Sequence, residues 1–309
     1  MIACGVALVQ WYSLHYCKQL KVENQSESPP QNLPTMRSIS CRYFTGVLIT
    51  VSAFASAAAQ TAPVVTLTRL ECGTNAAPTD VGLRFSDTYA FSGLKVQLVF
   101  SCYLVRHGDD YLMWDTGNPV GTTPTAPKTS LVNLLAQLKV APAQVKYVGI
   151  SHYHGDHTGQ VNAFPQSTLL IGKGDWDALN DSKSAAGASA ASFSNWMSGG
   201  SKVEALSGDR DVFGDGTVIM LNMQGHTPGH HSLLVKLKET GNVLITGDLS
   251  HFRENYDSDG VPTFNTDRAA SLASIDRFKK IAANLKATVI IQHDARDVGR
   301  LPAFPMAAK

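Results

Sequence analysis

The seven-residue segment SHYHGDH, residues 151–157, constrains this chain more than any other part of its sequence. Three of the seven residues are histidines and one is an aspartate. Neutral imidazole is a preferred ligand of borderline divalent ions such as zinc, and a carboxylate adds compensating charge and a hard oxygen. His152 and His154 can project to one side of an extended segment. Asp156 and His157 follow after a glycine, which permits a turn. The spacing predicts ligands for two adjacent metal ions rather than a run of surface polar residues.

Three further donors follow predicted strands later in the chain. They are His226 in GHTPGH, Asp248 in TGD and His293 in QHD. The apolar runs that precede them cover residues 218–223, 242–246 and 288–291. Together with the first segment they make five histidines and two aspartates, which are enough ligands for two ions in a shared site.

With these motifs the chain resembles the metallo-β-lactamase superfamily, whose signature is a His-x-His-x-Asp-His segment followed by a His, a bridging Asp and a last His. The resemblance covers nearly all of the chain from Val64 onward. It implies an α/β fold, the four-layer αβ/βα sandwich, with two divalent metal ions that the donor types favour as zinc. It also implies His152, His154 and His226 on one ion, Asp156, His157 and His293 on the other, and Asp248 as the bridge.

Asp115, in the segment MWDTG, resembles the aspartate that this superfamily places behind the metal-binding segment. A ligating histidine usually donates its second N–H to a carboxylate or carbonyl, which fixes the tautomer and the ring direction. We expect Asp115 to be that partner. An aspartate that caps a turn at a strand end is the alternative.

Asp248 separates branches of the superfamily. β-Lactamases do not use a bridging aspartate there, whereas lactonases, glyoxalase II-type thioesterases and several esterases and phosphotriesterases do. The segments GHTPGH at 225–230 and GDLSHFRENY at 247–256 are most similar to the N-acyl-homoserine lactonase family. This resemblance implies opening of a lactone ring by a metal-bridging hydroxide, with Asp156 and Asp248 in the catalytic centre. An exported organophosphate or aryl-ester hydrolase is the alternative, and a β-lactamase or a catalytically silent binding protein is disfavoured.

One expected substrate contact departs from the family pattern. Several such lactonases have a tyrosine three residues after the bridging aspartate, where it contacts the substrate. His251 occupies that position here and is predicted to donate to the lactone oxygen as a third catalytic residue. Tyr256 is a weaker candidate and is expected in the substrate pocket.

The segment 174–200 changes to small, weakly patterned residues. We interpret it as a mobile lid whose Phe193, Trp196 and Met197 line an apolar substrate pocket. The alternative is a surface helix whose aromatic side chains pack into the core.

The beginning of the chain has the pattern of a targeting segment. Residues 36–59 combine a basic lead, an apolar run and small residues, which is typical of a secretory signal peptide cleaved near Ala59. The apolar run is too short to favour a membrane span. We therefore expect a secreted or periplasmic protein without stable membrane insertion. Residues 1–35 are interpreted as a disordered extension from a start codon placed too early, and residues 60–309 as one hydrolase domain.

Charge and cysteine content narrow the partners. The chain has 26 basic and 25 acidic side chains, and removal of four and two of them with residues 1–59 leaves 22 and 23. Without a basic stripe, no nucleic-acid partner is expected, and the predicted partner is a small acyl lactone or ester. Cys72 and Cys102 remain after cleavage and can pair in an oxidising compartment. The sequence leaves that disulfide and a homodimer open.

Strand-like and helical runs alternate along residues 64–309. The patterns predict hairpins at 96–114 and 231–246, a strand at 145–150, a helix that starts at Thr129 and Ser130, and a helix at 267–287.

Overall fold

The structure is a computed structural model that describes residues 62–309 except 122, 182–186 and 188. All described residues belong to one compact unit, Ala59–Lys309. The predicted extension at 1–35 and the predicted signal peptide at 36–59 lie outside the described residues. Within the described part of the chain, no helix is long and apolar enough to cross a membrane.

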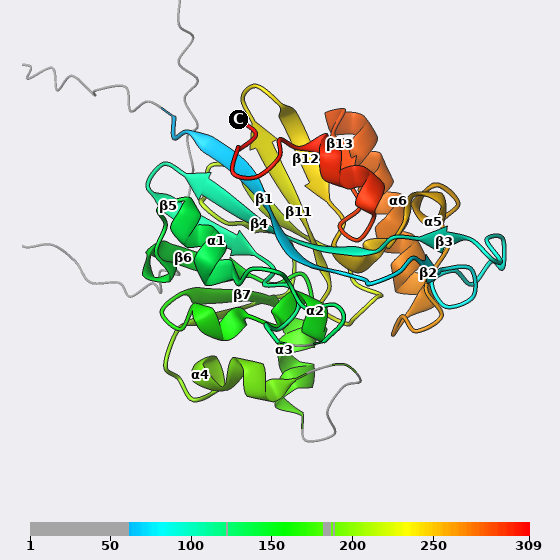
Figure 1. The fold of residues 1–309 in the computed structure, drawn as a ribbon, viewed down its shortest axis with the longest axis horizontal. Coiled ribbons are helices and arrows are strands. Elements are labelled where there is room, and N and C mark those ends of the chain that lie inside the picture. Colours follow the sequence, from blue (N-terminus) through cyan, green and yellow to red (C-terminus); the bar gives the residue numbers. More distant parts are fainter. Residues whose placement is uncertain (1–61, 122, 182–186, 188) are drawn as a thin grey trace, which may run out of the picture. The chain divides into compact units, whose positions relative to one another are not determined.

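Two sheets form the centre of the unit (Figure 1). The first has the strand order β1-β4-β5-β6-β7-β8, and the second has the order β13-β12-β11-β10-β9. The first sheet consists of β1 (Val65–Thr74), β4 (Val99–His107), β5 (Asp110–Trp114), β6 (Val145–Gly149), β7 (Thr168–Gly172) and β8 (Val203–Leu206). The second consists of β9 (Arg210–Asp211), β10 (Val218–Asn222), β11 (His231–Leu237), β12 (Gly241–Ile245) and β13 (Thr288–Ile290). A short pair, β2 (Thr79–Asp80) and β3 (Lys95–Val96), stands apart from both.

Alternation along the strands separates the two faces of each sheet. In β4, Tyr103 and Val105 belong to the core between the sheets, whereas Cys102 and Leu104 belong to the core beneath the helices. Successive side chains of a strand point to opposite faces, so one strand supplies both cores. Met220, Leu233, Val243 and Ile245 complete the inter-sheet core from the second sheet.

Helices cover the outer face of each sheet (Figure 1). The α-helices of the described residues are α1 (Leu131–Gln137), α2 (Gly155–Thr158), α3 (Lys173–Asn180), α4 (Ser194–Met197), α5 (Arg253–Asp257) and α6 (Arg268–Leu285), and α2 lies at an edge of the sandwich. α1 and α4 pack on the first sheet, and α6 packs on the second. The layers therefore run helix, sheet, sheet, helix, which confirms the predicted four-layer αβ/βα sandwich.

Local capping explains where the two predicted helices begin. The Ser130 side chain accepts a hydrogen bond from the Asn133 N–H at 3.3 Å, and Asp267 accepts one from the Ala270 N–H at 2.9 Å. Each cap satisfies a backbone donor that the first turn of a helix leaves free. Both helix starts are confirmed, and so are the two predicted hairpins, β4–β5 and β11–β12.

The predicted lid residues are core residues, so this prediction is corrected. Phe193 and Trp196 are buried in the core beneath α1 and α4, and Met197 packs against it. The Trp196 Nε1–H donates to the Ser167 carbonyl at 3.0 Å. Tyr256 is likewise buried in the core beneath α6, with its ring 6.1 Å from that of Phe278. The outer faces of the sheets need an apolar cover, and these side chains provide it.

Cys72 on β1 and Cys102 on β4 form a disulfide with a Cα–Cα distance of 5.9 Å. The two strands are antiparallel neighbours, and Leu70 is the partner of Cys102 in their register. The bond therefore joins adjacent strands of the first sheet and resolves the pairing that the sequence left open.

Candidate metal centre

The seven predicted donors come together at one edge of the sandwich. His152 and His154 follow the end of β6, and Asp248 and His293 follow the ends of β12 and β13. His226 lies in the connection from β10 to β11. β12 and β13 are parallel, so their carboxyl ends meet at the same edge. The expected turn at Gly155 is instead the start of helix α2, which carries Asp156 and His157 with His154 at its N-cap position.

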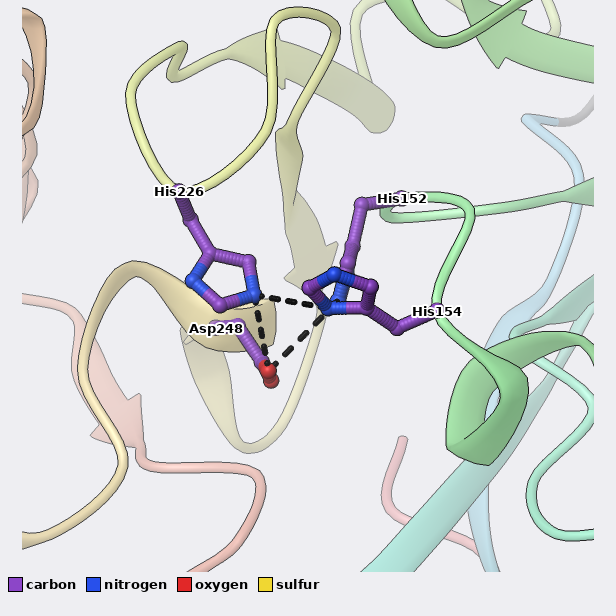
Figure 2. A group of neighbouring side chains, drawn as sticks. All are labelled: His152, His154, His226 and Asp248. Carbon is purple, nitrogen blue, oxygen red and sulfur yellow. Dashed lines mark hydrogen bonds and ion pairs between the residues drawn. The ribbon is translucent and has the colours of Figure 1, made fainter. Parts of the chain in front are cut away.

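The donors divide into two groups that share one residue. His152, His154, His226 and Asp248 form the first group, and Asp156, His157, Asp248 and His293 form the second. Within each group the ligand atoms lie within 4.8 Å of one another. Figure 2 shows the rings of His152 and His154 from one loop, the ring of His226 from another, and the Asp248 carboxylate converging on one point. Asp248 therefore has the position of a bridge between two ion sites.

The hydrogen bonds around the rings show that a cation fits between them. His226 Nδ1 is 2.8 Å from Asn265 Oδ1, and His293 Nδ1 is 2.8 Å from the Val99 carbonyl. These acceptors take the Nδ1 protons, so each neutral ring turns an Nε2 lone pair inward. His157 Nε2 and His293 Nε2 face each other at 3.1 Å. At this distance the two nitrogens need positive charge between them, from a proton or a metal ion, and this donor set suits a divalent metal ion.

The carboxylates give this edge a negative potential. Burial lowers the pKa of His157, but Asp248 and Asp115 outweigh that effect and raise the pKa well above its usual value. Burial alone raises the pKa of Asp248, yet His293 and His157 hold it well below its usual value. One oxygen of Asp248, Oδ1, is buried 2.8 Å from His293 Nε2 and 3.1 Å from His157 Nε2. A buried carboxylate among imidazoles favours a bound cation.

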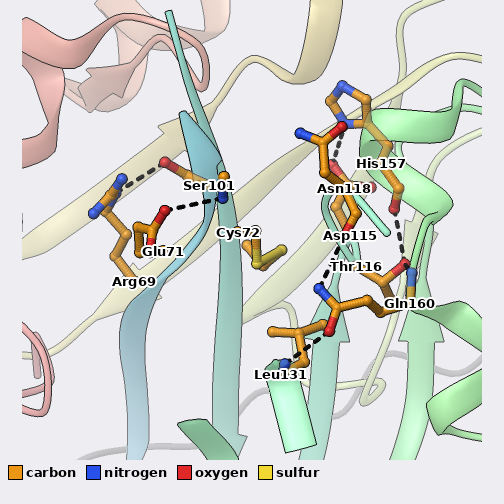
Figure 3. The surroundings of a disulfide bond; sticks show 12 residues. Arg69, Glu71, Cys72, Ser101, Asp115, Thr116, Asn118, Leu131, His157 and Gln160 are labelled. Carbon is orange, nitrogen blue, oxygen red and sulfur yellow. Dashed lines mark hydrogen bonds and ion pairs between the residues drawn. A yellow bond between two sulfur atoms is a disulfide. The ribbon is translucent and has the colours of Figure 1, made fainter. Parts of the chain in front are cut away.

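Asp115 lies behind the ligands, at the position that the sequence predicts (Figure 3). The His157 Nδ1–H donates to Asp115 Oδ2 at 2.8 Å, and the Ser151 N–H donates to Oδ1 at 2.7 Å. The Gln292 Nε2–H donates to Oδ2 at 2.7 Å. Asp115 itself has a backbone φ of 55°, which residues other than glycine rarely adopt. The backbone bends there so that one carboxylate reaches three donors from two sheets.

Several supporting residues were not singled out by sequence reasoning. Asn265 fixes the ring of His226, and Gln292 holds Asp115. His230, which the sequence places outside the ligand set, accepts the Asp248 N–H on Nε2 at 2.9 Å and does not belong to either group. Asn265 and His226 are 39 positions apart, and no spacing pattern connects them. Only the position of Gln292 beside His293 offered a sequence signal.

A cavity of ≈ 540 Å³ opens above both ligand groups. Its floor includes Asp156, Asp248 and His251, and three phenylalanines contribute to its wall. His251 Nε2 is 3.1 Å from Asp248 Oδ2, and its ring is 4.9 Å from that of Phe85. The remaining lining residues are Asn75, Thr79, Asp80, Arg84, Leu98, Phe100, His154, Gly155, Gly187, Phe264 and His293. The described lining does not include Phe193, Trp196, Met197 or Tyr256, in agreement with their places in the cores.

The sandwich and the His and Asp groups at its edge define a metal-dependent hydrolase. The sequence matches the family model of the Metallo-beta-lactamase superfamily over residues 99–293, and the chain belongs to this superfamily. It is 30% identical over 234 residues to the N-acyl homoserine lactonase AttM of Agrobacterium fabrum, covering 66% of this chain and 84% of the relative.

Solved structures give the same picture. The structure superposes on a crystal structure of a quorum-quenching N-acyl homoserine lactone lactonase with a TM-score of 0.66 and 25% identity, covering 79% of this chain and 98% of the other. A second match is an N-acyl homoserine lactone hydrolase with the product N-hexanoyl-L-homoserine bound at the catalytic metal centre. Its TM-score is 0.65 at 25% identity, covering 79% of this chain and 99% of the other.

Proposed function

We propose that the protein opens the lactone ring of N-acyl-homoserine lactones with two divalent metal ions. The imidazole and carboxylate donors favour zinc as the metal. The observation that carries this proposal is Asp248, which belongs to both ligand groups beneath the cavity. The similar proteins include lactonases and a hydrolase that holds its acyl-homoserine product at a metal centre. The fit of both His and Asp groups to a cation supports the dinuclear part.

The ligand assignment follows the two groups. His152, His154 and His226 would hold one ion, Asp156, His157 and His293 the other, and Asp248 both. When bound, the two cations supply Lewis acidity, which lowers the pKa of a water molecule and polarises the carbonyl group of the substrate.

The side chains on the cavity floor supply the rest of the chemistry. Asp156 Oδ2 is 3.7 Å from both His157 Nε2 and His293 Nε2, and its side chain is 30% exposed. It therefore places negative charge where a water molecule can reach it, as a catalytic carboxylate requires. His251 Nδ1 is buried, and Nε2 lies 3.1 Å from Asp248 Oδ2, so Nε2 is the nitrogen that would shift its hydrogen bond from Asp248 to a lactone oxygen held there.

The cavity suits an acylated small molecule. Its volume of ≈ 540 Å³ lies in the range of small-molecule sites. Phe85, Phe100 and Phe264 offer an apolar wall for an acyl chain, and Asn75 and Thr79 offer polar groups for the amide of the substrate. The Cys72–Cys102 disulfide also supports our proposal that the protein acts in the periplasm or outside the cell, because such bonds persist in oxidising compartments.

Metal analysis of the purified protein, combined with assays on a panel of substrates, tests the proposal. We expect two ions per chain and ring opening of N-hexanoyl- and N-decanoyl-homoserine lactone, measured through the proton that the new carboxyl group of each opened ring gives up. Asp248→Ala should lower kcat/KM at least about 100-fold while circular dichroism stays unchanged. Asp177→Ala, at an exposed position on α3, is the matched control. Activity confined to phosphotriesters would instead assign the organophosphate hydrolase alternative, and near-normal lactone turnover by Asp248→Ala would refute the bridging role.

A further inference from the structure

A buried carboxylate outside both ligand groups connects the loops that carry the first one. Asp175 lies in the first turn of α3 and is fully buried. Its Oδ2 accepts the Tyr153 N–H at 3.1 Å and the Thr227 hydroxyl at 2.9 Å. Its Oδ1 accepts the Gly229 N–H at 2.7 Å. Tyr153 stands between His152 and His154, and Thr227 follows His226. One side chain therefore holds both loops that Figure 2 shows converging.

Glycines allow the backbone of α3 to reach this position. A Cβ atom on Gly172 would lie 1.8 Å from the Gly229 carbonyl oxygen, and one on Gly174 would lie 2.5 Å from the Pro228 carbonyl oxygen. A Cβ atom on Gly229 would lie 2.5 Å from the Asp175 N atom. Side chains at these positions would force the two backbones apart. The contact thus depends on three glycines as well as on the carboxylate.

The two loops come from different sheets. The loop with His152 and His154 follows β6 of the first sheet, and the loop with His226 joins β10 to β11 of the second. Small shifts between the sheets would change the spacing of the three imidazoles unless the loops are tied to each other. A metal site tolerates errors of only about 0.2 Å in its ligand distances.

We propose that Asp175 is a positioning residue that sets the spacing of His152, His154 and His226 and thereby the metal affinity of the first ligand group. This inference rests on the dinuclear part of the proposed function. The second group has supports of its own, because Asp115 orients His157 and the Val99 carbonyl orients His293. Loss of the Asp175 carboxylate should therefore weaken one ion and leave the other in place.

The test compares Asp175→Asn with Asp177→Asn, which changes an exposed carboxylate on the same helix that pairs with Lys173. Asp175→Asn keeps the size of the side chain but replaces one acceptor with an NH₂ group, which faces a donor. Gly229→Ala loosens the same contact from the opposite loop. All proteins are studied at a pH above about 7, the value to which burial raises the pKa of Asp175.

The readouts are metal content, competition with a chelator, the spectrum of the cobalt-substituted protein, and thermal unfolding in chelator. We expect Asp175→Asn to bind one ion with normal affinity and the other about 10- to 100-fold more weakly. Gly229→Ala should do the same, while Asp177→Asn keeps both ions. In lactone turnover, kcat should fall and KM should change little, because the substrate pocket is intact.

A purely structural role would lower the unfolding temperature and leave both affinities unchanged, and that result would overturn the proposal. A wild-type protein with fewer than two ions would overturn it as well, together with the dinuclear site. If the wild type binds two ions without opening lactones, the substrate assignment alone fails, and the selective loss of one ion in Asp175→Asn still supports the role of Asp175.

Discussion

His251 stands where the family resemblance leads us to expect a tyrosine, and its geometry makes its role testable. Its Nε2 is 3.1 Å from Asp248 Oδ2, but it belongs to neither ligand group. Its ring contacts those of Phe85 and Phe264, with centroids 4.9 and 5.7 Å away. Phenylalanine can keep these ring contacts and removes only the donor.

We predict that His251→Phe lowers kcat for lactones by about 100-fold, because a donor to the developing negative charge is lost. Metal content should stay at the wild-type level. His251→Tyr, which restores the hydroxyl donor of the related lactonases, should recover part of the activity. Steady-state kinetics and metal analysis check both variants, and unchanged kcat in His251→Phe would exclude the donor role.

The ligands could be predicted from the sequence because their chemistry is carried by residue type and short spacing. Three histidines and an aspartate within six positions have few other uses. Asp175 and Asn265 act through the loops and rings of those ligands, and nothing in their local sequence distinguishes them from capping residues. Their roles depend on contacts across long separations, which spacing does not reveal.

At the scale of elements, the disulfide is the covalent link between β1 and β4. It lies beside the turn that carries Asp115: a Cβ atom on Gly117 would lie 2.2 Å from Cys72 Cβ, and the Asn118 N–H donates to the Cys72 carbonyl at 3.1 Å (Figure 3). Loss of the bond should therefore cost stability in the part of the first sheet that supports His157.

The double variant Cys72→Ser and Cys102→Ser should lower the free energy of unfolding by about 2–4 kcal/mol, because the bond restricts the unfolded chain across 30 residues of sequence separation. Urea unfolding of the metal-free protein measures the change. Reduced wild-type protein provides the control and should match the double variant. Equal transition midpoints for oxidised wild type and double variant would contradict the prediction.

The elements also show why some predictions succeeded and one did not. Ser130 and Asp267 cap helices through hydrogen bonds from backbone N–H groups three positions away. Because these contacts are local, the sequence predicts them. Phe193 and Trp196 were ambiguous, because apolar residues in a short helix suit a lid and a core equally well. The deciding fact was the outer face of the first sheet, which is assembled from distant strands.

At the scale of the whole molecule, the sandwich could be predicted because the motif resemblance carries the topology with it. The cavity wall could not, because Phe85, Phe100 and Phe264 come from three separate segments without a motif. A second contact that the sequence did not predict joins the two sheets at the carboxyl end of β4, away from the cavity. There, His107 Nε2 is 2.7 Å from Asp215 Oδ2, in the connection between β9 and β10, and the His107 ring stacks on Phe213 at 4.2 Å.

This pair makes the stability of the sandwich depend on pH at a site remote from the metal ligands. Partial burial raises the pKa of Asp215, but hydrogen bonds from Thr217 and His107 outweigh it and lower the pKa from 3.8 to about 2. A carboxyl group with a depressed pKa in the folded state stabilises the protein above its unfolded pKa, and this contribution disappears as the pH falls through the folded value.

Asp215→Asn should therefore be less stable than wild type near neutral pH, and the difference in the free energy of unfolding should shrink between pH 3.8 and about 2. Urea unfolding in chelator measures both proteins without metal, whose ligands also take up protons in acid. Asp109→Asn, at a fully exposed position, is the control. A difference that stays constant across that range would show that the Asp215 charge does not join the sheets.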